Sequence, residues 1–317
     1  MTTTQLPPGA GPRGLSLGDL QAPSAKRRKE ALVRGLFFVA AFSAVIITAL
    51  IVVSIVFEAI EFLTKIELSQ LSAIGWFPRR GLYDIGTLVV GTLLVSAIAM
   101  LVAVPLGLGA AVYLSEYAAP RTRRKIKPVL ELLAGVPSVV LGFFAISLIT
   151  PDLLTKINSQ VNFFNLAAAG IGVGILTLPL IASVAEDAMR AVPMSLREGA
   201  YGLGARKITV STRIVFPAAI SGIVAAFVLG LSRTIGETMV VAIAAGATGG
   251  SLFTTDIWGP GQTMTAAMAA LGTGTDQVKG DSAAFQSLYF VGLLLFVITL
   301  ALNIVGQRFV RRVQEKY

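Results

Sequence analysis

Two charged residues, Arg233 and Glu237, interrupt an apolar run that begins near Pro217. Charged side chains inside a membrane helix are costly, so they usually pair with one another or line a path for a polar substrate. The guanidinium group of arginine can donate two parallel hydrogen bonds to a phosphate-like oxyanion. A nearby carboxylate can accept a hydrogen bond from hydrogen phosphate, which keeps a proton at neutral pH, but not from sulfate. The pair therefore predicts a substrate path that selects a protonated oxyanion.

The spacing within this run predicts which way the pair faces. Arg233 lies 16 residues after Pro217, or about 24 Å along a straight helix. The residues at helical spacing on one face are Gly222, Ala226, Gly230, Arg233 and Glu237. Small residues let a neighbouring helix approach closely, so we expect the pair to face protein or a water path rather than lipid. The alternative is an intrahelical ion pair that merely tolerates burial.

The composition indicates an integral membrane protein. The chain has 317 residues, of which 55% are hydrophobic and only 14% are charged, whereas about a quarter of the residues in a soluble protein are charged. The mean hydropathy is +0.78. Cysteine and histidine are absent, which excludes disulfides, thiolate metal sites and histidine bases. We expect neither catalytic residues nor a metal site, and no nucleic-acid partner, because the net charge of +9 is carried by short loops.

Six apolar runs predict an all-α protein with six transmembrane helices. Each run is long enough to cross a hydrocarbon core of about 30 Å, and the runs comprise residues 36–57, 86–114, 128–150, 166–185, 216–247 and 287–307. The transmembrane domain is thus expected at residues 36–307, with its core at 86–307. We expect a disordered basic arm at residues 1–35 and a basic tail at residues 308–317.

The distribution of basic residues predicts the orientation in the membrane. Twenty lysine and arginine residues lie in the arm, the tail and the loops after the second and fourth spans, whereas five lie in the other three connectors. Cytoplasmic loops are enriched in lysine and arginine, so both termini are expected in the cytoplasm. Trp76 lies in a connector on the opposite side, where we expect it to anchor the chain at the membrane interface.

Pro137 and Ser138 interrupt the third span and are candidates to line the substrate path. A broken helix exposes backbone N–H groups to an anion, although a packing kink explains the same residues equally well. Glu131 lies near a helix end, where an acidic residue is unremarkable. Glu186 and Asp187 follow the fourth span, and we expect them to be solvated at the helix end. The alternative is that they fix the approach to the polar loop that follows.

The polar loop at residues 186–217 carries the most specific pattern in the chain. The residues of this pattern are Glu198, Gly199, Ala200, Gly204, Ile214 and Pro217. Their spacing resembles the cytoplasmic coupling loop of bacterial ABC-importer permeases, which reads E-A-A, three residues, G, nine residues and I-x-L-P. Gly199 and Phe216 depart mildly from that pattern. The alternative is an ordinary basic loop that fixes topology.

Local rules predict the shape of this loop. Glu198 is expected near a helix start, Gly204 in a turn between two short helices, and Pro217 at the start of the fifth span. Such a helix–turn–helix can transmit displacement from a protein that docks on it. The chain contains no G-x-x-x-x-G-K-[ST] motif, so the ATPase of such a system is expected to be a separate chain.

Three segments resemble a particular branch of this family, the phosphate-specific ABC importers. They are LSRTIGETMVV around Arg233, ELLAGVPSVVLGFF at residues 131–144 and VPLGLGAAVYLSEYA at residues 104–118. Of the two paralogous membrane subunits, the PstC-type subunit is the better match. The resemblance implies a type I importer fold in the bacterial cell membrane, surrounded by lipid, with Arg233 and Glu237 acting in phosphate transport.

The same resemblance implies partners for the chain. These are the paralogous permease subunit, which completes a heterodimer, a dimer of ABC ATPase subunits that binds ATP and Mg²⁺, and an extracytoplasmic phosphate-binding protein. The chain itself is expected to hold no cofactor and to act as a transport subunit rather than an enzyme.

Other functions are less well supported by the sequence. A permease for sulfate or molybdate would share the fold, but Glu237 beside Arg233 argues against a fully deprotonated anion. A secondary transporter or channel is expected to carry inverted repeats and further intramembrane acids, and the sequence shows neither. An intramembrane enzyme is least expected, because the spans contain no nucleophile–base or metal-ligand set.

Overall fold

The computed structural model describes residues 24–72, 74–246, 249–274 and 282–313. The chain divides into two units, Met1–Ser54 and Ile55–Tyr317, and we describe each by itself. Within the first, helix α1 (Ser24–Lys65, which continues into the second) already begins at Ser24. Residues 24–35 are therefore helical, and the expected arm is wrong there, whereas residues 1–23 lie outside the described part.

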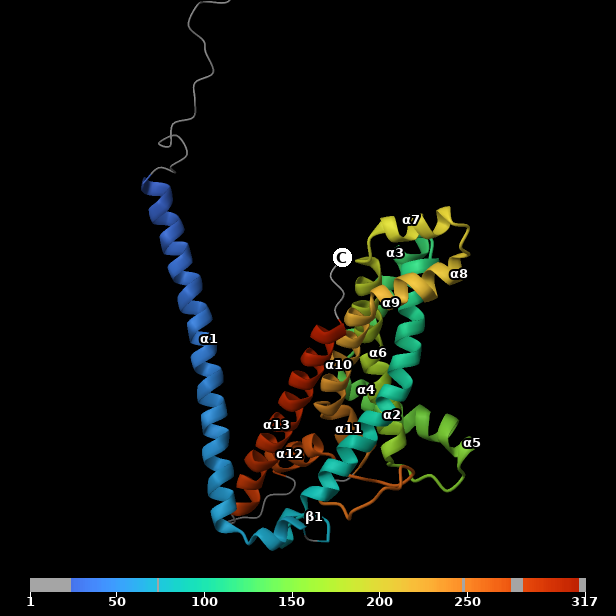
Figure 1. Ribbon diagram of the computed structural model, residues 1–317. Coiled ribbons are helices and arrows are strands. Elements are labelled where there is room, and N and C mark those ends of the chain that lie inside the picture. Colours follow the sequence, from blue (N-terminus) through green and yellow to red (C-terminus); the bar gives the residue numbers. More distant parts are fainter. Residues whose placement is uncertain (1–23, 73, 247–248, 275–281, 314–317) are drawn as a thin grey trace, which may run out of the picture. The chain divides into compact units, whose positions relative to one another are not determined.

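The second unit consists of helices and one short hairpin (Figure 1). The longer helices and their connecting helices are α2 (Ile85–Val112), α3 (Pro120–Ala134), α4 (Ser138–Phe144), α5 (Thr155–Ile157), α6 (Leu166–Arg190), α7 (Met194–Gly202), α8 (Lys207–Val210), α9 (Phe216–Ala218), α10 (Ile220–Ile235), α11 (Met239–Ala244), α12 (Met264–Gly272) and α13 (Ser282–Val313). Tighter or wider helical turns are η1 (Leu68–Ser72), η2 (Pro78–Arg80), η3 (Tyr113–Tyr117), η4 (Ala145–Leu154) and η5 (Ser211–Val215). Strands β1 (Trp76–Phe77) and β2 (Leu82–Tyr83) pair antiparallel.

Five described helices are long and apolar enough to cross a membrane. A sixth span is present if the helical segments Lys207–Ala218 and Ile220–Ile235, which meet at a bend of 68°, are counted as one. The prediction of an all-α, six-span protein is confirmed in this sense. The fifth span is not the single helix expected at residues 216–247, because it breaks at Ala219 and again after Ile235.

The third span also differs from the prediction. It begins at Ser138 rather than at Pro128, because Gly135 and Pro137 end one helix and start another. The residues before this break form α3, an amphipathic helix with no buried residue, which starts at Pro120. Proline has no backbone N–H group. In the first helical turn this costs no hydrogen bond, because an N–H group there would have no partner within the helix. The expected basic loop at 115–127 is therefore largely helical.

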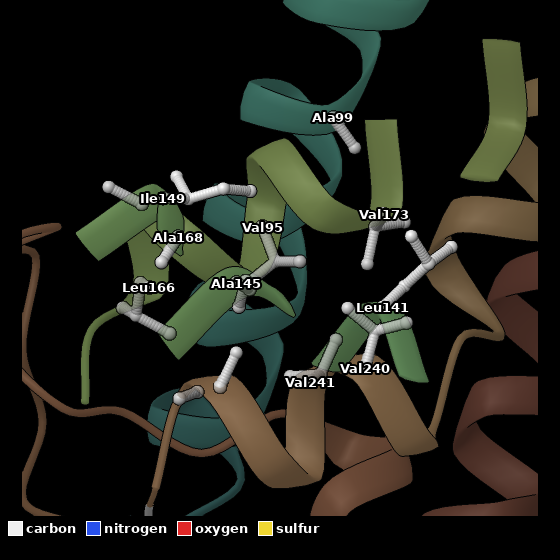
Figure 2. Packing of buried hydrophobic residues seen from close by; sticks show 14 of the residues in the cluster. Val95, Ala99, Leu141, Ala145, Ile149, Leu166, Ala168, Val173, Val240 and Val241 are labelled. Atoms are coloured by element: carbon white, nitrogen blue, oxygen red, sulfur yellow. The ribbon is translucent and has the colours of Figure 1, made fainter. Parts of the chain in front are cut away.

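The centre of the unit is the contact between α2 and α6, where backbones approach closely. A Cβ atom on Gly170 would lie 2.6 Å from Cβ of Ile98, and one on Gly174 would lie 2.8 Å from the carbonyl oxygen of Ala99. The two glycines lie one helical turn apart, so the backbones of α2 and α6 pack directly against each other there. Such contacts are common between membrane helices. Figure 2 shows the adjoining buried cluster, to which α2, α4, α6 and α11 contribute Val95, Leu141, Val173 and Val240.

A further apolar cluster of the second unit surrounds Trp76, beside strands β1 and β2. Its side chain is fully buried, with its ring centroid 5.8 Å from that of Tyr83. Phe62 packs on the other side of Tyr83, and α12, which the sequence did not predict, covers the cluster with Met264 and Leu271. The expected role of Trp76 as an interface anchor is therefore wrong, since its indole lies inside the protein.

We predict that Gly174→Ala destabilises the protein by about 1–3 kcal/mol, because the new methyl group meets backbone that cannot move away cheaply. Gly109→Ala in α2 is the matched control, since nothing lies within 4 Å of its added Cβ. The measurement is the thermal unfolding midpoint of the detergent-solubilised protein. Equal midpoints for the two variants would contradict the proposed backbone contact.

Candidate functional site

The polar loop forms two helical arms joined by a tight turn. The first arm is α7, and the second arm runs from Lys207 to Ala218 through α8, η5 and α9 (Figure 1). Gly204 in the turn has a φ of +79°, a left-handed conformation that favours glycine. The predicted turn between two short helices is confirmed. After Ala219 the chain bends by 68° into α10.

Two residues of the loop pattern lie elsewhere than expected. Glu198 is in the second turn of α7 rather than at its start, because α7 begins at Met194. Pro217 does not open the fifth span but lies in α9, at the end of the second arm. Proline can occupy this place because α9 is a new first turn, in which its missing N–H costs nothing.

The other pattern residues attach the arms to the spans. Ala200 is buried and Ile214 is half-buried, and both pack in an apolar cluster with the ends of α2, α6 and α10. Lys207 adds a contact with the ring of Tyr117 in η3, with its Nζ 5.0 Å from the ring centroid, within the range of a cation–π interaction. Gly199 has open space where its side chain would be.

An ion pair connects the first arm to the end of the second span. Nη1 of Arg197 in α7 lies 3.1 Å from Oε1 of Glu116 in η3, and Nη2 donates a hydrogen bond to the carbonyl oxygen of Met189 in α6. Both side chains are largely buried, with 13% and 5% exposure. Charges this far from water need their partners, so Arg197 holds α7 to both α2 and α6.

A second charge cluster connects α3 to α6. Glu186 is fully buried, and its carboxylate lies 2.6 Å from Nε of Arg123 and 3.3 Å from Nζ of Lys127. Lys127 also contacts Asp187 at 3.1 Å. The expectation that Glu186 is solvated is wrong, because α3 folds over it. The expectation holds for Asp187, whose side chain is 65% exposed.

The charge cluster shifts the pKa of Lys127. Partial burial favours the neutral amine, but the hydrogen bond to Asp187 and the charges of Glu186 and Asp187 outweigh it, so the pKa of Lys127 is raised. A raised lysine pKa stabilises the folded state below the usual value of the amine, and this contribution disappears only as the pH rises through the raised pKa. The α3–α6 connection is therefore intact throughout the neutral range.

The two charges of the fifth span are not one helical turn apart. Helix α10 ends at Ile235, so Arg233 lies in its last turn, whereas Glu237 lies in the break before α11. Gly236 ends the helix with a 3₁₀-like turn, in which N–H of Glu237 donates to the carbonyl oxygen of Thr234. The prediction that the pair shares one helix face is therefore wrong, and within the described residues no ion pair joins them.

Glu237 forms two hydrogen bonds at the break between α10 and α11. Its carbonyl oxygen accepts a hydrogen bond of 2.7 Å from the hydroxyl of Thr265, and its carboxylate accepts one of 3.4 Å from N–H of Val240 in α11. The first bond satisfies a carbonyl group released by the end of α10, and the second satisfies an N–H group at the start of α11. Glu237 thus joins α10, α11 and the segment leading into α12.

Arg233 is exposed and lines a hollow of about 350 Å³. The other lining residues are Glu131, Ala134, Leu176, Pro179, Leu180 and Ser183. Counted from Ile220, where α10 begins, Arg233 is about 20 Å along the helix at 1.5 Å per residue. The hollow is apolar apart from one cation, one acid and one hydroxyl, an arrangement typical of a selective ligand site.

The break in the third span lies beside a neighbouring hollow. The hollow is lined by Pro128, Glu131, Leu132, Gly135, Val136 and Pro137, and Ser138 opens α4. Glu131 was not predicted to be a site residue, because an acidic residue near the end of a helix has an ordinary explanation. Only the fold shows that Glu131 on α3 and Arg233 on α10 face the same space.

Comparison with protein families finds a match over residues 103–316 to the family of binding-protein-dependent transport system inner membrane components. Among similar curated proteins, the phosphate transport system permease protein PstC 1 of Mycobacterium tuberculosis is 36% identical over 258 residues, 75% of each chain. The phosphate transport system permease protein PstC of Mesorhizobium japonicum is 32% identical over 274 residues, 81% of this chain and 82% of that one.

Solved structures share the fold at low sequence identity. The permease fold of a bacterial alginate ABC transporter, solved in complex with its periplasmic protein, aligns with a TM-score of 0.64 at 14% identity, covering 92% of this chain and 98% of that chain. The inward-facing MetNI methionine ABC transporter aligns with a TM-score of 0.52 at 18% identity, covering 73% of this chain and 94% of that chain.

Two glycines of the loop pattern should respond to alanine in opposite ways. Gly204→Ala should lower stability by about 1–2 kcal/mol, because alanine is strained at positive φ. Gly199→Ala should raise stability by up to about 1 kcal/mol, since alanine favours a helix and meets no neighbour there. Amide hydrogen exchange of α7 and α8 measures both effects. Similar exchange in the two variants would contradict the assigned turn.

Proposed function

Because the chain belongs to the family of binding-protein-dependent transport system inner membrane components, we propose that it is a membrane-spanning subunit of an ATP-driven phosphate importer. Its similarity to phosphate transport permeases over about three quarters of its length is the observation that carries this proposal. The inner membrane is the location given by the family. In this function the chain passes inorganic phosphate from an extracytoplasmic binding protein to the cytoplasm by alternating access.

The proposed complex has further chains. A paralogous permease subunit completes a heterodimer, and a pair of ABC ATPase subunits binds ATP and Mg²⁺ and docks on the two arms formed by α7 and Lys207–Ala218. This places the arms and both termini in the cytoplasm, which the excess of basic residues in these segments supports. The chain supplies no ATPase site of its own, because its role is to transmit movement and to enclose the substrate.

The geometry supports a transmission route through fixed contacts. Movement of the ATPase subunits displaces α7, and the buried pair of Arg197 and Glu116 carries this displacement to α2. The second arm continues through one residue, Ala219, into α10. Arg233 at the far end of α10 then changes its position relative to α3 and α6, which carry the other charged and polar side chains of its hollow.

Arg233 is the proposed phosphate-binding residue of the path. Arg233 lines a hollow with mostly apolar walls, and an arginine side chain can form charge-assisted, bidentate hydrogen bonds with a phosphate group. Glu237, Pro137 and Ser138 are proposed to act nearby, at the helix breaks, where unpaired backbone groups can meet the anion. Glu237 acts in this proposal through the break between α10 and α11 rather than beside Arg233 on one helix.

We predict that Arg233→Gln lowers phosphate uptake by at least about tenfold, the effect of losing one charged hydrogen-bond partner, while the complex still assembles. Arg308→Gln, an exposed arginine near the end of α13 and outside the two arms, is the matched control. Uptake is measured with radiolabelled phosphate in vesicles that contain the whole complex and the binding protein. Normal uptake by the Arg233 variant would contradict the assignment of this residue.

The transmission route predicts a loss of coupling when the buried pair is broken. Glu116→Gln should leave the charge of Arg197 without its partner, at a cost of about 3 kcal/mol, and loosen α7 from α2. We expect more ATP hydrolysed per phosphate transported than in the parent complex. The double variant Glu116→Gln with Arg197→Met should recover part of the lost stability. An unchanged ratio of hydrolysis to transport would argue against this route.

A further inference from the structure

Three neighbouring hollows of the second unit share one side chain, that of Glu131. The first is the hollow of Arg233, and the second, of about 620 Å³, follows the break at Pro137. The third, of about 530 Å³, lies at the ends of α2, α3 and α6. All three are lined in part by Glu131, so they adjoin one another along α3, from the last turn of α10 to the end of the unit that carries the two arms, and we call the three together the groove.

The far end of this groove is strongly basic. The cationic side chains that line it are Arg123, Arg124, Lys127 and Arg190, and we call this end the basic vestibule. Arg123 and Lys127 are already paired with Glu186. Arg124 and Arg190 are exposed and have no ion-pair partner within the part of the chain that the structure describes. The vestibule therefore offers two free guanidinium groups to an anion.

We propose that this groove is the route by which the anion leaves Arg233 for the cytoplasm, with Glu131 as the gating residue between two cationic sites. The proposal rests on the proposed function. A carboxylate that lines both the Arg233 hollow and the basic vestibule repels an anion that passes it, so the anion is retained at Arg233 until the hollow widens. Glu131 is on α3 and Arg233 is on α10, and movement of α10 against α3 changes the distance between the two charges.

The coupling contacts give this gate a mechanical basis. The charge cluster of Glu186 fixes α3 to α6, and α6 supplies Leu176, Pro179 and Ser183 to the wall of the Arg233 hollow. Helices α3 and α6 thus form one wall, while α10, which follows the second arm, forms the other. A displacement of the second arm reaches α10 directly through Ala219 and changes the position of Arg233 relative to Glu131.

The phosphate group of an anionic lipid has the same chemistry as free phosphate and is a second possible source of the ligand. The basic vestibule adjoins the Arg233 hollow at Glu131, and this arrangement favours the free anion. A lipid headgroup would need only the vestibule, whereas a released anion needs the whole groove. A chemical modification in the Arg233 hollow should therefore impair phosphate transport only if the groove carries the free anion.

The absence of cysteine from the chain allows a direct test. Ala134→Cys places a single thiol in the hollow of Arg233, in the assembled complex in phosphatidylcholine vesicles, with the partner chains also free of reactive cysteine. Reaction with the anionic reagent sulfonatoethyl methanethiosulfonate should lower phosphate uptake by at least about tenfold, since it adds a fixed negative charge to the route. A neutral alkyl methanethiosulfonate of similar length, the butyl reagent, controls for size at the same thiol and should leave most of the uptake.

The gate is tested by the rate of this reaction. Glu131→Gln should accelerate modification of the Ala134→Cys thiol by the anionic reagent several-fold and leave the rate with the neutral reagent unchanged, because a repulsive charge is removed. Asp152→Asn, an exposed acid in η4, is the matched control and should change neither rate. Equal acceleration with both reagents would show a structural opening and overturn the electrostatic gate.

Inorganic phosphate should slow the reaction in neutral lipid. If the modification reaction is slowed only when phosphatidylglycerol is present, and not by phosphate, the groove binds lipid headgroups. This result would overturn the release route. Full modification by the anionic reagent with undiminished uptake would also overturn it. Uptake by the unmodified parent complex tests the proposed function separately. If the parent complex transports phosphate and the modified complex transports it equally well, the route is contradicted but the proposed function is not.

Discussion

A helix that breaks inside a membrane leaves backbone N–H and C=O groups that water cannot reach, and each must find a partner in the protein. The described chain satisfies this constraint with side chains, some of them local and some from distant segments. Thr265 donates to the carbonyl group of Glu237 where α10 ends, and Asn165 bonds to Thr150 and to N–H of Ala168 where α6 begins. Breaks of this kind are therefore built features, and the proposed substrate path lies beside two of them.

The charged residues divide between two tasks that the fold keeps apart. Glu116, Glu186 and their partners are buried and paired, and they fix α7 and α3 to the long helices. Arg233, by contrast, is exposed in the single chain and has no ion-pair partner within the described residues. Paired charges give rigidity to the parts that transmit movement, and a free charge remains available to a substrate. A buried pair that breaks would therefore impair transmission before it affected substrate binding.

Much of the fold could be predicted from hydropathy and local signals. Apolar runs located the spans, and Gly204 was recognised in its turn because the left-handed conformation there favours glycine. The break after Ile235 could not be predicted, because Gly236 is tolerated within a helix and the partner that makes a break favourable, Thr265, lies far along the chain. Glu131 and the burial of Glu186 were missed for the same reason, since α3 acquires its place only by tertiary contacts.

The bend of 68° between the second arm and α10 determines what kind of motion can pass along the chain. A push directed along the arm meets α10 at a steep angle, so most of it acts across the axis of α10 and little acts along it. Packed helices resist large sliding but accommodate rotation about a short hinge. Helix α10 is thus arranged as a lever with its fulcrum at Ala219, and not as a piston. Side chains at its far end sweep the longest arc, and Arg233 is among them.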